Sequence, residues 1–189
     1  MKIQTLGIAL LLILCGLRVS AQPRGLDIYF VDTEGGAATL IVTPQGESFL
    51  IDCGNPGERD AGRIAHVAKE VAHLTAIDAL ITTHWHLDHY GGVEELAKHI
   101  PIKKFYDHGI PEKSIDDPDN FPKLIAAYKA ASKGVSTTLN PGDMVPMQPS
   151  STGLSPTLRC LCARSEVIPD KPDSGKNLLA KGVDPLPPD

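Results

Sequence analysis

Short apolar runs recur along the chain up to about residue 140, and turn residues separate them. Runs rich in Ile, Val, Leu, Phe and Tyr are typical of β-strands. The turn Pro44-Gln45-Gly46 joins two of these runs so closely that they should pair as an antiparallel hairpin. The expected strands cover residues 26–31, 38–43, 48–51, 77–83 and 102–106.

Between the later strands, apolar positions repeat at the spacing of an amphipathic helix. Asp60 is placed to cap a helix that runs through His73, and further helices are expected at 92–99, before Pro101, and at 121–132. The buried face of the first helix is expected to comprise Ile64, Val67, Ala68, Val71 and Ala72. An antiparallel start followed by strand–helix alternation predicts an α/β domain with a mixed sheet and helices packed on it.

The pattern changes after Asn140, where prolines interrupt the chain and only residues 158–163 are predicted to form a strand. Cys160 and Cys162 would share one face of that strand, and we expect them to fill the core. Residues 169–189 are rich in Pro, Gly, Lys and Asp and predict a loop or a disordered tail. The predicted folded domain therefore spans residues 22–168.

The first residues have the layout of a secretory signal peptide. Lys2 precedes an apolar run over residues 6–17, and small residues at 19–21 resemble a cleavage site. Residues 1–21 are therefore predicted to be removed, which makes the protein secreted or periplasmic without a stable membrane anchor. The alternatives are an uncleaved amphipathic anchor and lipid attachment at Cys15, where the large Leu14 disfavours a lipoprotein signal.

Composition narrows the class of protein. A chain of 189 residues corresponds to about one domain, and 42% hydrophobic with 22% charged residues excludes a fibrous or wholly disordered chain. The net charge of −5 gives no clear nucleic-acid surface. Three cysteines remain after residues 1–21, and an odd number implies no complete disulfide framework.

The candidate chemistry lies in residues 84–89, His-Trp-His-Leu-Asp-His, directly after the predicted strand 77–83. His84 and His86 are two residues apart, so both rings point the same way in extended backbone. Gly91-Gly92 is expected to let the chain bend tightly into the next helix. Imidazole and carboxylate ligands suit Zn²⁺, and also manganese and iron. The predicted metal ligands are His84, His86, Asp88 and His89.

Two further residues follow predicted strands. His108 comes after strand 102–106, and it either faces the metal pocket or lies beside it. Asp52 comes after strand 48–51, where it either orients a ligand imidazole or only terminates the strand. The remaining histidines are expected to be structural: His66, His73 and His99.

The motif His84-x-His86-x-Asp88-His89, with Gly91-Gly92 after it, resembles the signature of the metallo-β-lactamase fold superfamily. Residues 27–36, 51–52 and 105–109 more narrowly resemble secreted hydrolases similar to the hydrolase domain of the competence protein ComEC. The resemblance implies an αβ/βα sandwich with its active site at one edge of two facing sheets. It covers residues 26–168, which would correspond to the N-terminal half only.

The resemblance also implies a role for each motif residue. His84 and His86 would bind a first metal ion, Asp88 and His89 a second, and Asp88 would act in catalysis. The implied cofactor is one or two Zn²⁺ ions, with Mn²⁺ or iron as alternatives. The implied reaction is hydrolysis by a metal-activated water, on a small-molecule or phosphoester substrate and, from the ComEC-like branch, a phosphodiester.

The resemblance is incomplete in one respect. Further ligands of the superfamily, a later histidine and a metal-bridging aspartate, come from its second half, and no histidine follows His108 here. An alternative hypothesis is therefore a truncated, catalytically incomplete metal-binding protein. Because half of a sandwich leaves one sheet face bare, self-association is a third hypothesis.

Overall fold

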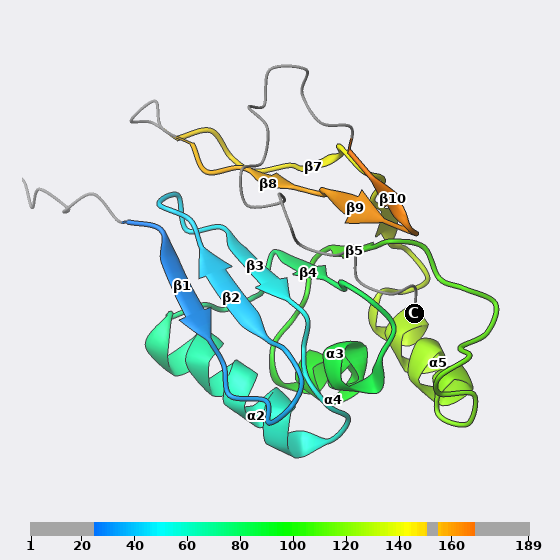
Figure 1. Ribbon diagram of the computed structural model, residues 1–189. Helices are drawn as coiled ribbons and strands as arrows, with labels where there is room; N and C mark the ends of the chain where they lie inside the picture. The colour runs from blue at the N-terminus through cyan, green and yellow to red at the C-terminus, as the bar shows by residue number, and fades with distance from the viewer. Residues whose placement is uncertain (1–24, 151–154, 169–189) are drawn as a thin grey trace, which may run out of the picture.

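The computed structural model describes residues 25–150 and 155–168 (Figure 1). Within these residues a six-stranded sheet has the order β1-β2-β3-β4-β5-β6. The first three strands pair antiparallel, whereas β3 to β6 pair in parallel. This arrangement confirms the predicted α/β class, the hairpin and the mixed sheet. The strands are β1 (Asp27–Phe30), β2 (Thr39–Val42), β3 (Ser48–Ile51), β4 (Ala79–Ile81), β5 (Phe105–Asp107) and β6 (Thr137–Thr138).

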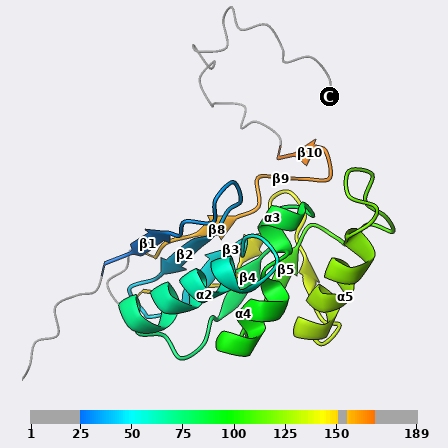
Figure 2. The same cartoon turned by 90° about the horizontal axis from the view of Figure 1, so that it is seen from below.

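The helices α2, α4 and α5 cover one face of this sheet (Figure 2). Their apolar residues and the facing strand residues form the larger core cluster, which includes Leu40, Leu50, Ile64, Leu80, Leu96 and Tyr128. No helix within the described residues combines the length and apolar character that crossing a bilayer requires. The helices are α2 (Glu58–His66), the π-helical η1 (Val67–Val71), α3 (Leu87–Tyr90), α4 (Val93–His99) and α5 (Phe121–Ala131).

The opposite face of the sheet carries a smaller apolar cluster. Side chains alternate between the faces of a strand, so Leu40 and Val42 of β2 are buried under the helices while Ile41 lies on this second face. The second cluster contains Phe49, Ala79, Tyr106, Leu139 and Val145. Two short strands pack against it, β7 (Met144–Val145) and β8 (Leu158–Arg159), and the paired strands β9 (Cys162–Ala163) and β10 (Glu166–Val167) follow.

Asp60 does not cap the first helix, which begins earlier, after Gly57. Its carboxylate accepts hydrogen bonds from the backbone N and from Nδ2 of Asn55, at 2.8 and 3.0 Å. Burial raises the pKa of Asp60, but the hydrogen bonds from Arg59 and Asn55 outweigh it and leave this pKa below its usual range. The predicted helical face is also only partly buried, because the change to π-helix at Val67 turns Val71 outward, where it is 49% exposed.

The prediction that Cys160 and Cys162 fill the core is wrong for Cys162, whereas Cys160 packs against the second apolar cluster. The chain leaves β8 at Arg159 and re-enters a strand only at Cys162, so residues 158–163 are not one strand. Cys160 is half-buried and Cys162 is exposed, whereas Cys53 is the buried cysteine. Burial raises the pKa of the Cys53 thiol well above its usual value. The predictions for residues 1–21 and 169–189 lie outside the described residues.

Candidate metal centre

The parallel strands β3, β4 and β5 bring three predicted site residues to one edge of the sheet. Asp52 follows β3, His84 lies just after β4, and His108 follows β5. The carboxyl ends of parallel strands share an edge, and this is where α/β proteins bind ligands. The sheet topology therefore gathers residues that are far apart in the sequence.

Trp85 fixes the direction of the two histidines beside it. Its side chain is 6% exposed, its Nε1 donates to the carbonyl oxygen of Gly109 at 2.8 Å, and its ring meets Tyr90 and Tyr128 edge-on. His86 is the N-cap of α3 and is still extended, with φ −87° and ψ 142°. Because side chains alternate in extended backbone, an inward Trp85 places His84 and His86 together on the other side.

The rings of His86 and His89 both lie close to the ring of His84. Nε2 of His84 lies 3.1 Å from Nδ1 of His86. The ring centroids of His84 and His89 are 3.9 Å apart, and those of His84 and His86 are 4.6 Å apart. One ligand atom each from Asp52, His84 and His89 also lies within 4.8 Å of the other two.

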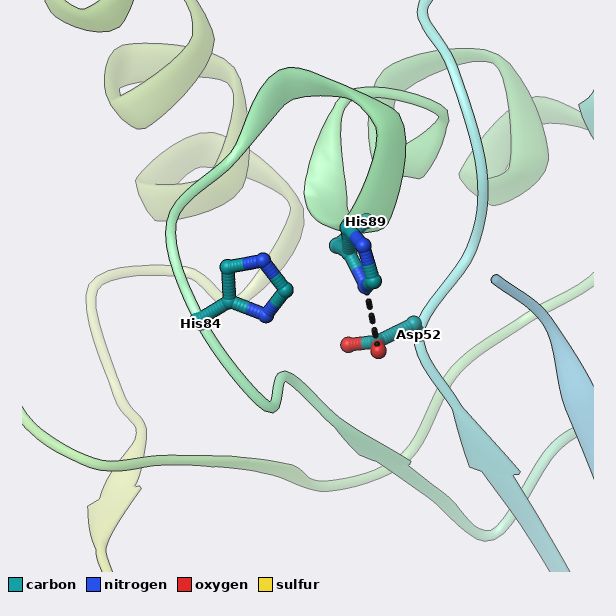
Figure 3. Close-up of side chains that lie close together, drawn as sticks. All are labelled: Asp52, His84 and His89. Carbon is teal, nitrogen blue, oxygen red and sulfur yellow. Dashed lines mark hydrogen bonds and ion pairs between the residues drawn. The ribbon is translucent and has the colours of Figure 1, made fainter. Parts of the chain in front are cut away.

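Asp52 uses both carboxylate oxygens to hold this arrangement. Its Oδ1 accepts the backbone N–H of Thr83 at 2.8 Å, and its Oδ2 accepts the Thr83 hydroxyl at 2.6 Å. The same Oδ2 lies 2.8 Å from Nδ1 of His89, as Figure 3 shows. A carboxylate only accepts hydrogen bonds, so Nδ1 of His89 carries the proton and Nε2 is left as the metal-binding nitrogen.

The position of Asp52 requires an uncommon backbone conformation. Its φ is 58°, in the left-handed region that aspartate tolerates better than most residues. The side chain is buried, with 1% of the residue exposed. The contacts with Thr83 and His89 hold this residue in place, which is typical of a functional site.

Asp88 borders the same cluster. Its Oδ2 lies 3.7 Å from Nε2 of His89, and its side chain is 32% exposed. Its carbonyl oxygen accepts the backbone N–H of Ala37 at 3.3 Å, so the β1–β2 loop packs against the motif. A Cβ atom on Gly36 would lie 2.1 Å from that carbonyl oxygen. Glycine is needed there for the close approach of the two backbones.

The structure also gives a reason for Gly91-Gly92 that differs from the expected tight bend. Gly91 and Gly92 both have helical dihedrals, with φ −65° and −74°, which any residue adopts. A Cβ atom on Gly92 would instead lie 2.1 Å from the carbonyl oxygen of Cys53. Gly92 therefore permits contact between the loop after β3 and the start of α4.

Asp116 is a neighbour of the centre that the sequence did not indicate. It lies in the loop between β5 and α5, and its Oδ2 is 3.4 Å from Nε2 of His86. Both side chains are largely exposed. An aspartate in an acidic loop looks like a solvated turn residue, so no sequence pattern singled it out.

His108 lies beside the ring cluster rather than within it. It borders one hollow together with His84 and His86, and its ring centroid is 5.9 Å from that of Trp85. Burial lowers the pKa of His108, and the nearby Asp107 opposes this shift. Neither ring nitrogen has a hydrogen-bond partner within the described residues, although both are shielded from solvent.

The arrangement of donors fits a metal ion. Two imidazole nitrogens on one tetrahedral Zn²⁺ lie about 3.4 Å apart, close to the 3.1 Å between His84 and His86. Burial, and then His89 and His86, lower the pKa of His84 below its usual value. Since metal ions bind neutral imidazole, these surroundings favour the ligand form of His84.

An α/β sheet with imidazoles and carboxylates close together at the carboxyl ends of its parallel strands defines a protein with a candidate metal site at the sheet edge. The sequence profile of the metallo-beta-lactamase superfamily matches residues 31–158. The chain belongs to this superfamily, whose members typically bind metal ions.

Two curated fungal proteins are similar to parts of the chain. The thioesterase pkgB of Emericella nidulans is 29% identical over 113 residues, which cover 58% of this chain and 30% of that protein. The atrochrysone carboxyl ACP thioesterase of Aspergillus fumigatus is 39% identical over 66 residues, which cover 35% of this chain and 20% of that protein. The chain thus spans less than a third of the length of either relative.

Two solved structures are also similar. A metallo-beta-lactamase motif mutant from Cronobacter sakazakii gives a TM-score of 0.39 at 18% identity, over 65% of this chain and 48% of that chain. A metallo-beta-lactamase from Hirschia baltica gives a TM-score of 0.33 at 20% identity, over 64% of this chain and 57% of that chain.

Proposed function

We propose that this protein is a metal-dependent hydrolase that uses an activated water. The observation that carries the proposal is the approach of two histidines to His84, whose ring centroid lies 3.9 Å from that of His89 and 4.6 Å from that of His86. Imidazole and carboxylate groups gathered at one edge of the sheet are the ligands that Zn²⁺ takes in proteins, so a metal ion is the simplest reason for this arrangement. Zn²⁺ suits these donors best, and Mn²⁺ or iron are alternatives.

The residues have distinct roles in this proposal. His84, His86 and His89 hold the cation, and Asp52 keeps the His89 ring in the correct tautomer. A cation held by these residues would lower the pKa of a bound water and polarise the bond to be cleaved. Asp88, 3.7 Å from His89, is the carboxylate placed to ligate or to take up the proton that the water releases.

Two substrate classes are candidates. The resemblance to ComEC-like hydrolases supports a phosphodiester, whereas the names of the two fungal relatives support a thioester. In either case water adds to the central atom, the bond to the leaving oxygen or sulfur breaks, and an acid is released. The net charge of −5 favours a small substrate over a nucleic-acid duplex.

The test uses the full 189-residue chain, loaded with Zn²⁺ or Mn²⁺. We expect stoichiometric metal, and metal-dependent hydrolysis of acetylthiocholine or of bis(p-nitrophenyl) phosphate. His86→Ala should abolish hydrolysis, because it removes the nitrogen 3.1 Å from His84. His99→Ala is the matched control, since His99 pairs with Glu58 away from the centre. Substoichiometric metal, or hydrolysis that survives His86→Ala, would contradict the proposal.

A second candidate is metal binding without turnover. Among the described residues, only Asp52, His84 and His89 form a compact cluster of potential ligand atoms, and this cluster contains no residue from the segment after His108. If a further histidine and a bridging aspartate are needed, as the truncation hypothesis holds, the chain would bind metal and hydrolyse neither substrate. Self-association and export remain predictions, and export depends on residues 1–21, outside the described residues.

A further inference from the structure

A cavity of about 290 Å³ lies on the sheet face opposite the helices. Its floor is formed by Ile51 and Ile81, which are register neighbours on β3 and β4. Its other wall is formed by Val145 and Leu158, which are paired across β7 and β8, and by Leu139. These five side chains make two sides of the cavity aliphatic, while Thr82, Asp107 and Arg159 also belong to its lining. The volume is near the lower end of the range for ligand pockets.

This cavity ends at the metal centre. Thr83 and His108 belong to its lining, and Thr83 Oγ1 lies 3.0 Å from Nδ1 of His84. His108 also borders two hollows that contain His84, one beside His86 and one beside the β9–β10 turn. A substrate could thus place its apolar chain in the cavity and its reacting group at the histidines.

The imidazole of His108 provides polar atoms where the cavity meets the metal centre. Its Nδ1 and Nε2 are shielded from solvent and have no hydrogen-bond partner within the described part of the chain. Shielded polar atoms of this kind are unfavourable unless a ligand or water satisfies them. A polar atom of a bound substrate, placed between the cavity and the metal centre, would do so.

The cavity lining carries one charge of each sign, the buried carboxylate of Asp107 and the guanidinium of Arg159. The guanidinium of Arg164 is occupied by the carbonyl oxygen of His108 and by Oδ1 of Asn140, at 2.7 and 2.6 Å. Nε of Arg159 donates to the carbonyl oxygen of Gly142 at 3.2 Å. These hydrogen bonds orient the two guanidinium groups, while Ile51, Ile81 and Leu158 offer methyl and methylene groups to the cavity.

We propose that this cavity binds the apolar chain of an acyl substrate, with the carbonyl group at His108 beside the metal centre. The proposal rests on the proposed hydrolase function and names the substrate class of that site. It follows from three observations: the aliphatic wall, the position of Thr83 and His108 at its end, and the unpartnered nitrogens of His108.

Calorimetric titration of the metal-loaded full chain with butanoate, hexanoate and octanoate tests this site. The affinity should rise about fourfold for each added methylene while the alkyl chain fits the cavity. Ile81→Phe, which fills the floor, should remove this dependence on chain length. Leu158→Phe on the facing wall repeats the test, in case the first variant does not fold.

Ile28→Phe is the matched control, because Ile28 is 49% exposed on the edge strand β1 and does not line the cavity. It should leave the affinities unchanged. Affinity that does not depend on chain length, or that responds to Ile28→Phe but to neither cavity variant, overturns the proposal.

These titrations, combined with the hydrolysis assay, separate this proposal from the hydrolase function. If the metal-loaded chain hydrolyses acetylthiocholine or bis(p-nitrophenyl) phosphate but its affinity for the carboxylates does not depend on chain length, the hydrolase function stands and the cavity assignment is wrong. If the chain binds no metal but the metal-free protein still shows a chain-length dependence that Ile81→Phe removes, the cavity assignment stands and the hydrolase function is wrong.

Discussion

Oδ2 of Asp52 lies 2.8 Å from Nδ1 of His89, although the two residues are 37 positions apart in the chain. The contact joins the end of β3 to the short helix α3, and Asp52 also holds Thr83 at the end of β4. A single buried carboxylate thus fixes both segments that carry the metal centre. Its negative charge also stabilises a cation bound next to the His89 ring.

Asp52→Asn should weaken metal affinity by about 10–100-fold, because an amide no longer provides the charge that orients His89. Competition with a chromophoric chelator measures this affinity. Asp78→Asn is the matched control, since Asp78 is a hydrogen-bonded carboxylate near the opposite end of β4. An unchanged affinity in Asp52→Asn would mean that Asp52 only terminates its strand.

Gly92→Ala should destabilise the fold by about 1–3 kcal/mol, the range for overpacking. Its Cβ would lie 2.1 Å from the carbonyl oxygen of Cys53, so one of two backbones must move. Gly62→Ala in α2 is the control, because its Cβ meets only the flexible end of Glu58 at 3.1 Å. That variant should gain about 0.5–1 kcal/mol. Urea denaturation compares the two, and equal effects would refute the close-approach argument.

Tyr128→Phe should lower the free energy of unfolding by about 1–3 kcal/mol. The Tyr128 hydroxyl donates to Oδ2 of Asp107 at 3.0 Å in the core, and Asp107 Oδ1 accepts the N–H of Gly109. Burial, together with Asp107, raises the pKa of Tyr128 far above its usual value. Tyr29→Phe on the half-buried strand β1 should change stability much less in the same urea denaturation, and a smaller effect at Tyr128 would contradict this view.

Asp78 should make the fold sensitive to acid. Burial raises its pKa, but hydrogen bonds from Lys103 and Ser48 outweigh burial, so the folded pKa lies below its usual range. A carboxyl group with a depressed folded pKa stabilises the fold above its unfolded pKa of about 3.9, and this stabilisation is lost as pH falls through the folded value.

The stability gap between the wild-type chain and Asp78→Asn should therefore be largest near neutral pH and close below about pH 4. Thermal unfolding followed by circular dichroism across this range measures the gap. Asp119→Asn in the exposed β5–α5 loop is the control, and should show no comparable gap. If the stability difference between the wild-type chain and Asp78→Asn is the same at low pH, ionisation of Asp78 is not its cause.

Local patterns in the sequence determined most of the elements. Apolar alternation located β1, β2 and β3, and the helical repeat located α4 and α5, because both periods depend only on neighbouring residues. The spacing of His84 and His86 also predicted that their rings share one side, since an extended backbone alone imposes this. The resemblance of the motif led to the superfamily that the sequence profile matches.

Tertiary structure decided what depends on residues far apart in the chain. Asp60 was expected to cap a helix, but Asn55 from the preceding loop binds its carboxylate instead. Cys162 was expected in the core beside Cys160, but β8 ends at Arg159 and Cys162 is exposed in β9. The approach of Asp116 to His86 and the cavity beside His108 likewise arise only when separate loops meet. Such contacts leave no periodic trace in the sequence, because packing in three dimensions sets them.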